Sequence, residues 1–456
     1  MSDADRAKDL FFEGLAHCDA GDYAAAEPCF RAALAIVPGR VSVLTNLATV
    51  LLRQRKFEEA ADVADQAIAA DDTAEDAFLA ATSAHYELGR TERALALFPR
   101  LAAIAPENPA VWLGLGSTLE LAGRFDEAAA TYDRLIALEA ARGHLFRALL
   151  RLRLGDFASG WAEHEWRLRL PDHPTAGAAN GVPLWTGYDP TGRRILLTIE
   201  QGHGDVLQFL RYAPLVAARG AAVTLMVPPT LRGLIADSFP GMTIVDRADP
   251  ALSYDAHAAL MSLPAIFGHR SEDAIPRTVP YLTAAPEMVE KWRARLGSEG
   301  LRVGIAWQGN PVFPTDRTRS IPLAAFAPLA GVPGVRLISL QARQGLDQLN
   351  DLPAAMAVER LGPELEDNPD GFRELAAVME SLDLIVTSDT APAHLAGALG
   401  RPVWVALRTS ADWRWLEDRA DSPWYPTMRL FRQRASGDWP GVFGEIATAL
   451  GKFAGA

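Results

Sequence analysis

The pattern of apolar and polar positions changes character along this chain. Up to about residue 142, small and aromatic residues return in a fixed frame of the kind found in paired amphipathic helices. From Arg193 onward, short apolar runs alternate with helical patterns, as at Ile195–Ile199, Ala222–Val227 and Arg302–Trp307. Strands that alternate with helices predict a parallel sheet. We therefore expect a helical region followed by an α/β region.

The helical region has an internal repeat. Gly21, Gly89 and Gly123 are separated by 68 and 34 residues, and Arg55 stands at the missing step. Each of these positions is followed by a similar frame of small and aromatic residues, such as residues 123–132. Small residues let paired helices approach closely, and aromatic residues fill the space between neighbours. The period and the frame resemble tetratricopeptide repeats, an α-solenoid of antiparallel helix pairs.

A fifth, altered copy follows at Gly155–Arg167, and its register is shifted by two residues. A shifted final unit is expected of a cap that docks on another element, so the predicted array covers residues 7–170. Solenoids of this kind present a concave surface, which predicts a peptide or protein partner; a spacer or a dimerisation arm is the alternative. Residues 171–190 are predicted to be a linker, because 171–183 are rich in Pro, Gly and Ala.

Composition limits the possible classes of function. The 456 residues are too many for one ordinary core, so two or three domains are expected. A net charge of −13 argues against nucleic acid or an anionic membrane as the main partner. The two cysteines, Cys18 and Cys29, are interpreted as small buried residues rather than a disulfide or a metal site. Without a signal peptide pattern or a long apolar stretch, the predicted location is cytoplasmic.

Leu382–Leu407 has the order strand, turn, helix, strand. The apolar run Leu384–Val386 meets the polar turn Thr387–Thr390, and a helix of small residues leads to a second apolar run, Val403–Leu407. The turn lies where a strand ends and a helix begins. Free backbone N–H groups and the helix dipole make such a junction a good seat for a phosphate. By itself this pattern predicts a generic ligand site.

Particular residues of this junction fit that role. Thr390 can cap the helix, Pro392 suits its first turn and Gly400 suits its exit. His394 follows Thr390 by one turn, so the two residues share a face. Ser388 and Asp389 complete the predicted ligand-binding turn.

The α/β region is predicted to form two doubly wound halves, residues 191–285 and 300–435, with a carboxyl-terminal helix at 436–456. Prolines between the halves mark a break, and a fresh strand opens the second half. Two such halves would place a ligand cleft between them, outside the carboxyl ends of their strands.

The loop after the first strand reads Gly202-His203-Gly204-Asp205. Its two glycines permit a sharp turn and the close approach of a ligand. Asp205 is either the N-cap of the next helix or a carboxylate in the cleft that takes a proton from an acceptor hydroxyl. His203 is a weaker candidate for the same work.

The corresponding loop of the second half contains Gln308 and Asn310, and the run 316–320 contains Arg319. Arginine suits a diphosphate because its guanidinium is permanently charged and presents a fork of donors; a solvated surface arginine is the alternative. The sequence has no GxGxxG or GxxxxGK[ST] loop, no HExxH and no convincing acidic metal cluster, which disfavours NAD enzymes, P-loop NTPases and metal catalysis.

Four tryptophans cluster toward the end of the chain: Trp404, Trp413, Trp415 and Trp424. We expect them to pack the two halves and the tail together, and stacking of one of them against a base or sugar is the alternative.

The segment from Asp389-Thr390 through His394 to Gly400-x-Pro402 resembles the nucleotide-sugar signature of the ADP-heptose:lipopolysaccharide heptosyltransferase family (glycosyltransferase family 9). In that family a Gly-Asp pair after the first strand carries the catalytic base, and Gly204-Asp205 matches it. In the same family a basic residue in the loop after the first strand of the second half contacts the phosphates. Arg319 is the counterpart of that residue here. The whole chain is similar to bacterial TPR-containing glycosyltransferases, some of them linked to flagellin glycosylation, and resembles O-GlcNAc transferase in outline.

This resemblance implies a GT-B fold of two Rossmann-like domains and an inverting glycosyltransferase that uses a nucleotide-sugar donor without a metal or cofactor. It implies Asp205 as the base. The implied donor-binding residues are Arg319, Ser388, Asp389, Thr390 and His394. The implied loop and acceptor residues are Gly202, His203, Gly204, Gln308 and Asn310.

The repeats imply a protein acceptor, with flagellin as one candidate. Arg319 replaces a lysine common in the family, and Arg408-Thr409-Ser410 replaces its Gly-Pro-Thr, so the donor sugar stays open. Two alternatives also stay open. One is a non-catalytic adaptor with a degenerate transferase domain, and the other is a transferase that acts on lipopolysaccharide or another glycan.

Overall fold

The computed structural model describes residues 2–171, 173, 181–249, 252–312 and 316–455. By its internal contacts the chain divides into two compact units, Met1–Leu150 and Arg151–Ala456, so the division comes before the predicted end of the array at residue 170. Residues 172 and 174–180 of the predicted linker, 171–190, lie outside the described residues. Among the described helices, none has the length and apolar character that a membrane crossing requires.

The first unit consists of antiparallel helices. They are α1 (Asp3–Asp19), α2 (Tyr23–Ile36), α3 (Val41–Arg53), α4 (Phe57–Ala70), α5 (Glu75–Glu87), α6 (Thr91–Ile104), α7 (Pro109–Leu121), α8 (Phe125–Leu138) and α9 (Ala140–Arg153), which continues into the second unit. This confirms the helical array predicted from the repeat.

The repeat period is visible in the backbone turns inside the helix pairs. Gly21, Arg55, Gly89 and Gly123 all adopt the left-handed conformation, with φ of 75°, 61°, 67° and 72°. At each turn the next amide bonds a carbonyl five residues back, as Asp22 N does to His17 O at 2.9 Å. This is the Schellman arrangement that ends many helices. Arg55 therefore fills a glycine position, as its place in the repeat predicts.

Close packing within the helix pairs depends on glycine against an aromatic ring. A Cβ atom placed on Gly14 would lie 2.7 Å from the ring of Phe30, and one on Gly116 would overlap the ring of Tyr132. Phe30 and Tyr132 are completely buried. The alternation of small and aromatic residues in the sequence thus produces the interface between paired helices.

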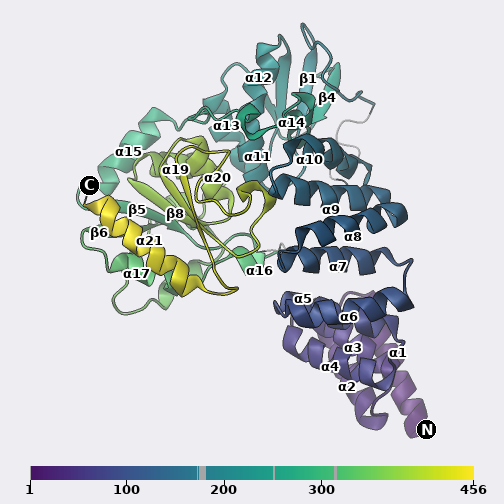
Figure 1. Cartoon of the computed structure of the whole chain (residues 1–456). Coiled ribbons are helices and arrows are strands. Elements are labelled where there is room, and N and C mark those ends of the chain that lie inside the picture. Colours follow the sequence, from purple (N-terminus) through teal and green to yellow (C-terminus); the bar gives the residue numbers. More distant parts are fainter. Residues whose placement is uncertain (1, 172, 174–180, 250–251, 313–315, 456) are drawn as a thin grey trace. The chain divides into compact units, whose positions relative to one another are not determined.

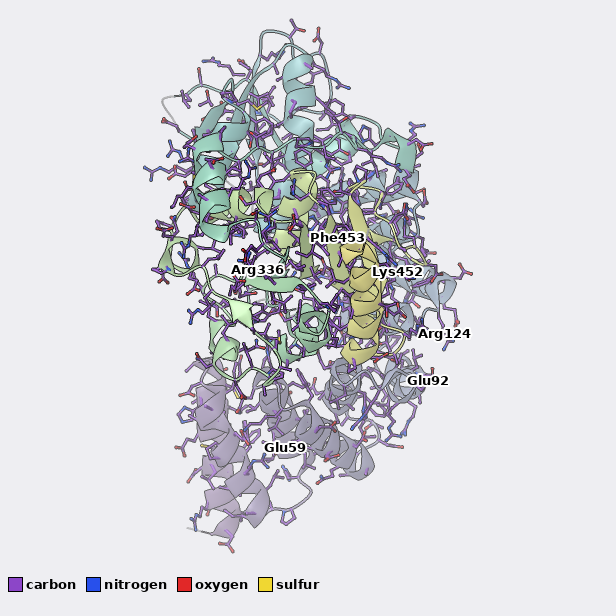
Figure 2. All side chains as sticks on the ribbon, turned by 90° about the vertical axis from the view of Figure 1, so that its left-hand side faces the viewer. Glu59, Glu92, Arg124, Arg336, Lys452 and Phe453 are labelled. Carbon is purple, nitrogen blue, oxygen red and sulfur yellow. The ribbon has the colours of Figure 1, made fainter. Side chains whose placement is uncertain are left out.

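The surface of this unit carries ion pairs between helices of neighbouring repeats. Arg31 of α2 lies 2.5 Å from Glu59 of α4, which Figure 2 labels, and Arg93 of α6 lies 3.1 Å from Asp65 of α4. These side chains are 34–56% exposed. Exposed pairs of this kind contribute about 0–1 kcal/mol each.

The second unit begins with the end of α9, followed by α10 (Phe157–His164) and the 3-10 helix η1 (Glu165–Arg169). Its first sheet has four parallel strands in the order β3-β2-β1-β4. They are β1 (Arg194–Thr198), β2 (Ala222–Met226), β3 (Thr243–Val245) and β4 (Ala256–Ala259). The helices around this sheet are α11 (His203–Phe209), η2 (Leu210–Tyr212), α12 (Ala213–Ala218), η3 (Pro229–Leu231), α13 (Arg232–Ser238), η4 (Leu260–Ser262), α14 (Leu263–Ile266), η5 (Glu272–Ala274) and, beyond it, α15 (Pro286–Leu296).

The second sheet has six parallel strands in the order β10-β9-β8-β5-β6-β7. They are β5 (Leu301–Ala306), β6 (Val335–Ser339), β7 (Val358–Glu359), β8 (Leu384–Ser388), β9 (Val403–Leu407) and β10 (Met428–Arg432). The associated helices are α16 (Asp316–Arg319), η6 (Leu323–Phe326), α17 (Ala327–Ala330), η7 (Leu346–Asn350), α18 (Pro363–Glu366), α19 (Gly371–Glu380), α20 (Ala391–Ala398), η8 (Trp413–Trp415) and α21 (Trp439–Ala454). The predicted strands and the predicted carboxyl-terminal helix are confirmed, with ends that differ slightly from those expected.

The central strands β8 and β9 are buried at every position, as parallel strands covered on both faces must be. Helix α21 runs across one face of the six-stranded sheet, where the ring of Phe443 lies 4.3 Å from that of Phe326 (Figure 1). At the end of that helix the ring of Phe453, labelled in Figure 2, packs on Trp404 at 5.8 Å.

Strand order locates the place where a ligand is expected. In the first sheet β1 lies between β2 and β4, and in the second β5 lies between β6 and β8. Within each sheet the strand order therefore reverses at this central strand. Such a reversal opens a crevice at the carboxyl ends of the strands. The loops that follow β1, β5 and β8 therefore surround the expected ligand positions.

Candidate functional site

A cavity of about 440 Å³ lies at the carboxyl ends of the strands of both sheets. The predicted site residues that line it are Gly202, His203, Gly204, Asp205, Gln308, Asn310, Arg319, Asp389, Thr390 and His394. The prediction for Ser388 is wrong. It is the completely buried last residue of β8, covered on both faces of the sheet, and does not reach the cavity.

The first strand leads directly to Asp205. Gly202 is the N-cap of α11 and Asp205 is the third residue of that helix, so the interpretation of Asp205 as an N-cap is wrong. Its carboxylate accepts a hydrogen bond from Arg414 Nη2. Burial raises the pKa of Asp205 above its usual range, and the charge of Arg414 opposes part of that rise. A carboxylate with a raised pKa is a stronger base at neutral pH than an ordinary surface aspartate.

Gly204 is required because two helices from different sheets meet at this point. A Cβ atom on Gly204 would lie 2.9 Å from His394 Cδ2, which belongs to α20. The missing side chain brings the start of α11, with Asp205, beside the start of α20, with Thr390. The Gly-Asp pair thus joins the two walls of the cavity.

His203 lies on the cavity wall with its ring fixed in place. Its Nε2 lies 2.7 Å from Thr230 Oγ1, and its ring stacks on Phe372 with centroids 5.1 Å apart. Burial lowers the pKa of His203, so the imidazole is neutral at physiological pH. These contacts hold the His203 ring against Thr230 and Phe372. Because the ring is already engaged, Asp205 remains the stronger candidate for the base.

The phosphate seat predicted at α20 has a different internal geometry from the one expected. Thr390 occupies the N-cap position, but its side chain makes no capping bond, so the predicted side-chain cap is wrong. Instead its hydroxyl lies 3.4 Å from the carbonyl and the hydroxyl of Ser388. Pro392 lies in the first turn and Gly400 has φ of +70°, both as predicted. Thr390 lines the cavity and leaves the helix start open.

His394 shares the cavity wall with Thr390, as its spacing predicts, but without a positive charge. Burial, followed by the charge of Arg414, lowers the pKa of His394 to about 3. Its Nδ1 lies 3.0 Å from the hydroxyl of Tyr425, and its ring stacks on Trp415 at 5.3 Å. A neutral imidazole can exchange hydrogen bonds with a ligand but adds no positive charge to the cavity.

Arg319 reaches the cavity from α16. A Cβ atom on Gly309 would lie 3.2 Å from Arg319 Nη2 and 3.0 Å from Thr390 Cγ2, so this glycine lets the two side chains converge. Among the described residues, Arg319 bonds Asp316 through Nε at 3.4 Å, and its side chain is 27% exposed. The guanidinium therefore keeps donors and charge for an anionic ligand.

Gln308 and Asn310 hold the shape of the loop after β5. The backbone of Gln308 bonds the Gln341 side chain in both directions, and Asn310 Oδ1 accepts the Val312 amide at 3.1 Å. The Gln308 side chain accepts a bond from Gln348 Nε2 at 3.0 Å. Residues 308–310 form part of the cavity wall.

Two further carboxylates titrate together in the cavity. Burial, and then the negative charge of Asp412, raises the pKa of Asp389 to about 6. The pKa of Asp412 stays below its usual range, because bonds and charge from Arg414 outweigh the effect of burial. Two adjacent carboxylates divide their protonation in this way because like charges oppose each other. Asp412 is the more acidic member of the pair and is ionised at neutral pH.

Arg414 connects these acidic groups. Its side chain bonds Asp412 Oδ1 through Nη1 at 2.8 Å, Gln208 Oε1 through Nε at 2.6 Å and Asp205 through Nη2. The residue is 5% exposed, and the surrounding carboxylates raise its pKa despite burial. The arginine therefore remains charged and fixes the base loop of one sheet to the loop after β9 of the other.

Sequence reasoning missed Asp412 and Arg414. The pattern drew attention to the tryptophans of this segment, and Trp404, Trp413, Trp415 and Trp424 are all buried. Trp424 packs on Phe209 of the first half, and Trp404 packs on Phe453 of the carboxyl-terminal helix, as the packing prediction requires. The available signal was position, because the segment follows β9 at the same sheet edge as Asp389.

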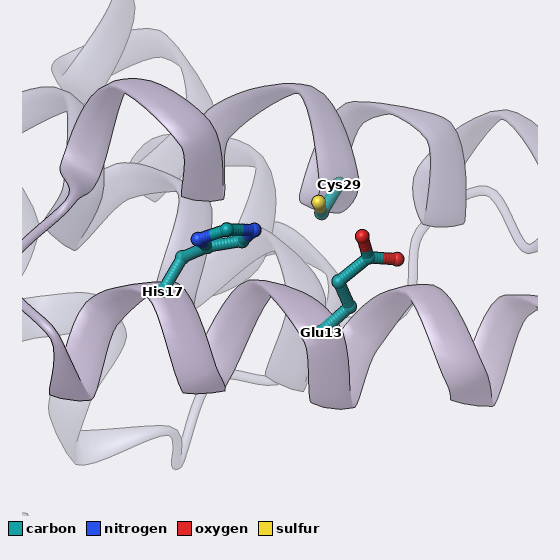
Figure 3. Close-up of side chains that lie close together, drawn as sticks. All are labelled: Glu13, His17 and Cys29. Carbon is teal, nitrogen blue, oxygen red and sulfur yellow. The ribbon is translucent and has the colours of Figure 1, made fainter.

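A second group of potential ligands lies in the repeat unit. Glu13 and His17 of α1 face Cys29 of α2, with one ligand atom of each within 4.8 Å of the others (Figure 3). Three ligands are one fewer than a structural zinc site uses, and Glu13 is exposed. Burial and the Glu13 carboxylate also raise the pKa of the Cys29 thiol, which keeps it protonated. Cys18 and Cys29 are free and half-buried. The expectation that no metal is needed concerns the cavity and stays a prediction.

Comparison with known families supports two parts of the chain. Residues 13–75 and 85–152 match the tetratricopeptide repeat, and residues 359–414 match glycosyltransferase family 9 (heptosyltransferase). These matches confirm the predicted resemblance. The second match is short. It includes Asp389, Thr390, His394 and Arg414, and it includes neither Asp205 nor Arg319.

The chain is also similar to individual proteins. Protein FlbA of Caulobacter vibrioides is 26% identical over 495 aligned residues, which cover 95% of this chain and 82% of FlbA. A thermophilic TPR protein of Thermus thermophilus is 21% identical, with 36% of this chain and 92% of that chain covered and a TM-score of 0.32. The MamA protein is 17% identical, with 36% and 88% covered and a TM-score of 0.31.

Proposed function

We propose that the chain is an inverting glycosyltransferase with a GT-B arrangement that takes its sugar from a nucleotide-sugar donor. One observation carries the proposal. A half-buried carboxylate from one sheet, Asp205, shares a cavity with an arginine and a helix start from the other sheet, Arg319 and α20. The family 9 match supports it, because that match spans the loops after β8 and β9 on the donor side.

The donor half would bind the diphosphate. Arg319 supplies permanent charge, Thr390 supplies a hydroxyl, and the start of α20 supplies the positive end of a helix dipole. Neutral His394 offers a hydrogen bond on the same wall. Together these groups stabilise the negative charge that develops on the leaving group, which is work that a metal does in other enzymes.

The transfer itself needs a base on the opposite wall. The acceptor hydroxyl gives its proton to the Asp205 carboxylate while its oxygen bonds the anomeric carbon of the sugar. The bond from that carbon to the phosphate oxygen breaks, and its electron pair leaves with the nucleoside diphosphate. Because the base and the leaving group lie on different walls, the sugar is attacked from the face opposite the phosphate, which inverts its configuration.

Asp389 and Arg414 would complete the site around the sugar. Asp389 lines the cavity next to Thr390 and can accept hydrogen bonds from sugar hydroxyls. Arg414 keeps Asp205 in place, and its charge opposes part of the rise in pKa that burial causes, which favours the ionised base.

The repeats would supply the acceptor. Tetratricopeptide repeats catalyse no reaction and bind peptides or proteins on their concave surface, so a protein acceptor is proposed, with flagellin as one candidate. Deletion of residues 1–138, which leaves α9 intact, should abolish modification of the true acceptor. Donor hydrolysis by the same truncated chain should persist and shows that the remaining part is folded. Normal modification by the truncated chain would contradict docking by the repeats.

A screen of nucleotide sugars tests the proposal as a whole. A donor at about 100 times its Kd should stabilise the protein by about 2.7 kcal/mol, which thermal denaturation detects. The hit should then be hydrolysed slowly without an acceptor. A chain that binds a nucleotide sugar but neither hydrolyses nor transfers it would instead be the non-catalytic adaptor.

A further inference from the structure

The segment from the end of α9 to η1 packs directly behind the loops that carry the site. Among the described residues it contributes none to the cavity lining, yet three of its buried side chains reach the base loop or the segment around Arg414. All of these residues belong to the second compact unit. The three contacts indicate a role in the chemistry that the repeat pattern did not suggest.

Trp161 of α10 joins the two loops from behind. Its ring lies edge-on against Phe209 at 6.1 Å and against Trp413 at 5.4 Å. Phe209 ends the helix that carries Asp205, and Trp413 is the immediate neighbour of Arg414. Trp161 is 2% exposed, so any displacement of its ring must move one of these partners.

Arg167 of η1 fixes the base loop through a buried ion pair. Its Nε and Nη2 bond the two carboxylate oxygens of Glu200 at 2.8 and 2.9 Å, and Nη2 also bonds Ser262 Oγ at 2.8 Å. His173 Nε2 lies 2.8 Å from the same carboxylate. Glu200 stands two residues before Gly202. Because both of its oxygens are bonded, Glu200 holds the chain between the end of β1 and the start of α11.

Arg153 reaches the other loop. Its Nε pairs with Glu417 and its Nη1 bonds Ser410 Oγ at 3.2 Å, so it touches both sides of the turn that contains Asp412 and Arg414. Arg153 is 6% exposed. Arg167 thus holds the base loop and Arg153 holds the loop around Arg414, each through an ion pair. The indole ring of Trp161 contacts both loops.

We propose that Trp161 and Arg167 are positioning residues of the transfer site, which act through Phe209, Trp413 and Glu200 to hold Asp205 against Arg414. This role rests on the proposed function for its chemical meaning. The contact between Asp205 and Arg414 joins loops 209 residues apart in the sequence. Such a contact needs support from behind, because a shift of about an ångström in a catalytic group costs a large part of its effect.

Hydrogen–deuterium exchange of the full chain tests the role without a substrate. Arg167→Met and Trp161→Phe should each accelerate amide exchange in peptides covering 200–209 on the order of tenfold. Trp161→Phe should do the same in 410–417. Exchange in strand β5, 301–306, should not change. Arg151→Met is the matched control, because Arg151 pairs with Glu163 at 2.9 Å within the same segment.

The outcome separates positioning from general stability. Equal exchange in Arg167→Met and Arg151→Met, or a change confined to 157–167, would overturn the proposal. Trp161→Phe is the milder change. It tests whether the segment positions the loops if Arg167→Met does not fold. Arg167→Lys should restore part of the protection, because it keeps the charge next to Glu200.

Enzyme kinetics distinguish a positioning role from a merely structural one, because only the first changes kcat and the pH–rate profile selectively. With a hydrolysed donor, both variants should lower kcat and leave KM within about twofold, since the donor wall is untouched. The acid limb of the pH–rate profile should move to higher pH, because an Asp205 that drifts from Arg414 loses the charge that lowers its pKa. An unshifted profile with an equal loss in KM would contradict positioning. If the wild-type chain hydrolyses no nucleotide sugar, the proposed function fails, and the exchange result still decides whether this segment orders the loops.

Discussion

One charged contact of the repeat unit and one of the α/β unit lie at opposite extremes of burial and of sequence separation. In the repeats, ion pairs such as Arg31–Glu59 lie on the surface and join residues 28 positions apart. In the α/β unit, Arg414 is buried and bonds Asp205 from a loop 209 positions away. The first kind of contact repeats with the helices, and the second occurs where two sheets meet.

The difference in burial leads to a difference in the free-energy cost of losing an ion pair. An exposed pair is screened by water and costs little to lose, whereas a buried charge without its partner costs several kcal/mol. The buried charges of the α/β unit accordingly have partners, as Arg414 has in the cavity and Arg167 has behind it. In this chain the cavity contains Asp205, Asp389, Asp412 and Arg414, and the repeats stabilise themselves mainly by small and aromatic side chains.

The largest effect should come from removing Arg414. Arg414→Met removes a buried cation from two carboxylates whose side chains are 18% and 38% exposed, those of Asp205 and Asp412. The loss should be on the order of 3 kcal/mol of unfolding free energy, because partial hydration of the carboxylates reduces the penalty of an unpaired buried charge. Ten of the eleven tryptophans lie in residues 151–456, so denaturation followed by tryptophan emission reports on this unit. Arg31→Met is the surface control and should cost no more than about 1 kcal/mol by circular dichroism. Similar losses of unfolding free energy for both variants would show that burial does not decide the cost of losing an ion pair.

The next effect concerns the approach of the two helix starts. Gly204→Ala places a methyl group 2.9 Å from His394 and should cost about 1–3 kcal/mol, because neither helix can move freely. Gly444→Ala is the control, since a Cβ there meets no atom of the described residues within 4 Å and alanine favours a helix. Denaturant titration should show a loss in the first variant and none in the second. Equal stability would mean that α11 and α20 have room to separate.

A half-buried carboxylate, that of Asp389, should also make the α/β unit sensitive to pH. The folded-state pKa of Asp389 is about 6, above the unfolded value of 3.8, so its protonated form favours the fold. That contribution is present below about pH 4 and is lost as the pH rises through about 6. Asp389→Asn should therefore be more stable than wild type by about 1–2 kcal/mol at about pH 7.5 and equal to it at about pH 4.

The measurement is the difference in unfolding free energy between wild type and Asp389→Asn at each pH, which cancels all other titrating groups. A constant difference across the range would show that Asp389 is not the group that titrates.

The smallest effect belongs to the repeat unit. Arg55 has φ of 61°, where a side chain strains the backbone, and Gly21, Gly89 and Gly123 occupy the equivalent positions. Arg55→Gly should raise the unfolding free energy by about 0.5–1 kcal/mol, measured by circular dichroism. Gly89→Ala should lower it by a similar amount. A loss of stability in Arg55→Gly would mean that the arginine side chain itself stabilises the turn.

The same contrast explains what the sequence could predict. The left-handed turns of the repeats were predictable because each one is determined by residues within its own repeat. Gly204-Asp205, Arg319 and Asp389-Thr390 were predictable as a group because parallel strands bring the loops at their carboxyl ends to one edge of each sheet, and a ligand cleft was expected between the two halves. The ends of β1, β5 and β8 could be recognised from apolar runs alone.

What could not be predicted depends on contacts between distant segments. The pairing of Asp205 with Arg414 follows from the packing of two sheets, and no local pattern encodes it. Burial also decided the properties of individual side chains. It made His394 neutral, and it placed Ser388 inside the sheet although the residue belongs to the predicted turn. Neither effect is visible before the chain is folded.

The most direct test of the account is the rate of sugar transfer or donor hydrolysis by Asp205→Asn. This change removes the base and keeps the size of the side chain. It should lower kcat by about 10²–10⁴ and leave the Kd of the donor within about twofold, because the diphosphate is held by the other wall. A variant that turns over at the wild-type rate would contradict the assignment of Asp205 as the base and, with it, the proposed site.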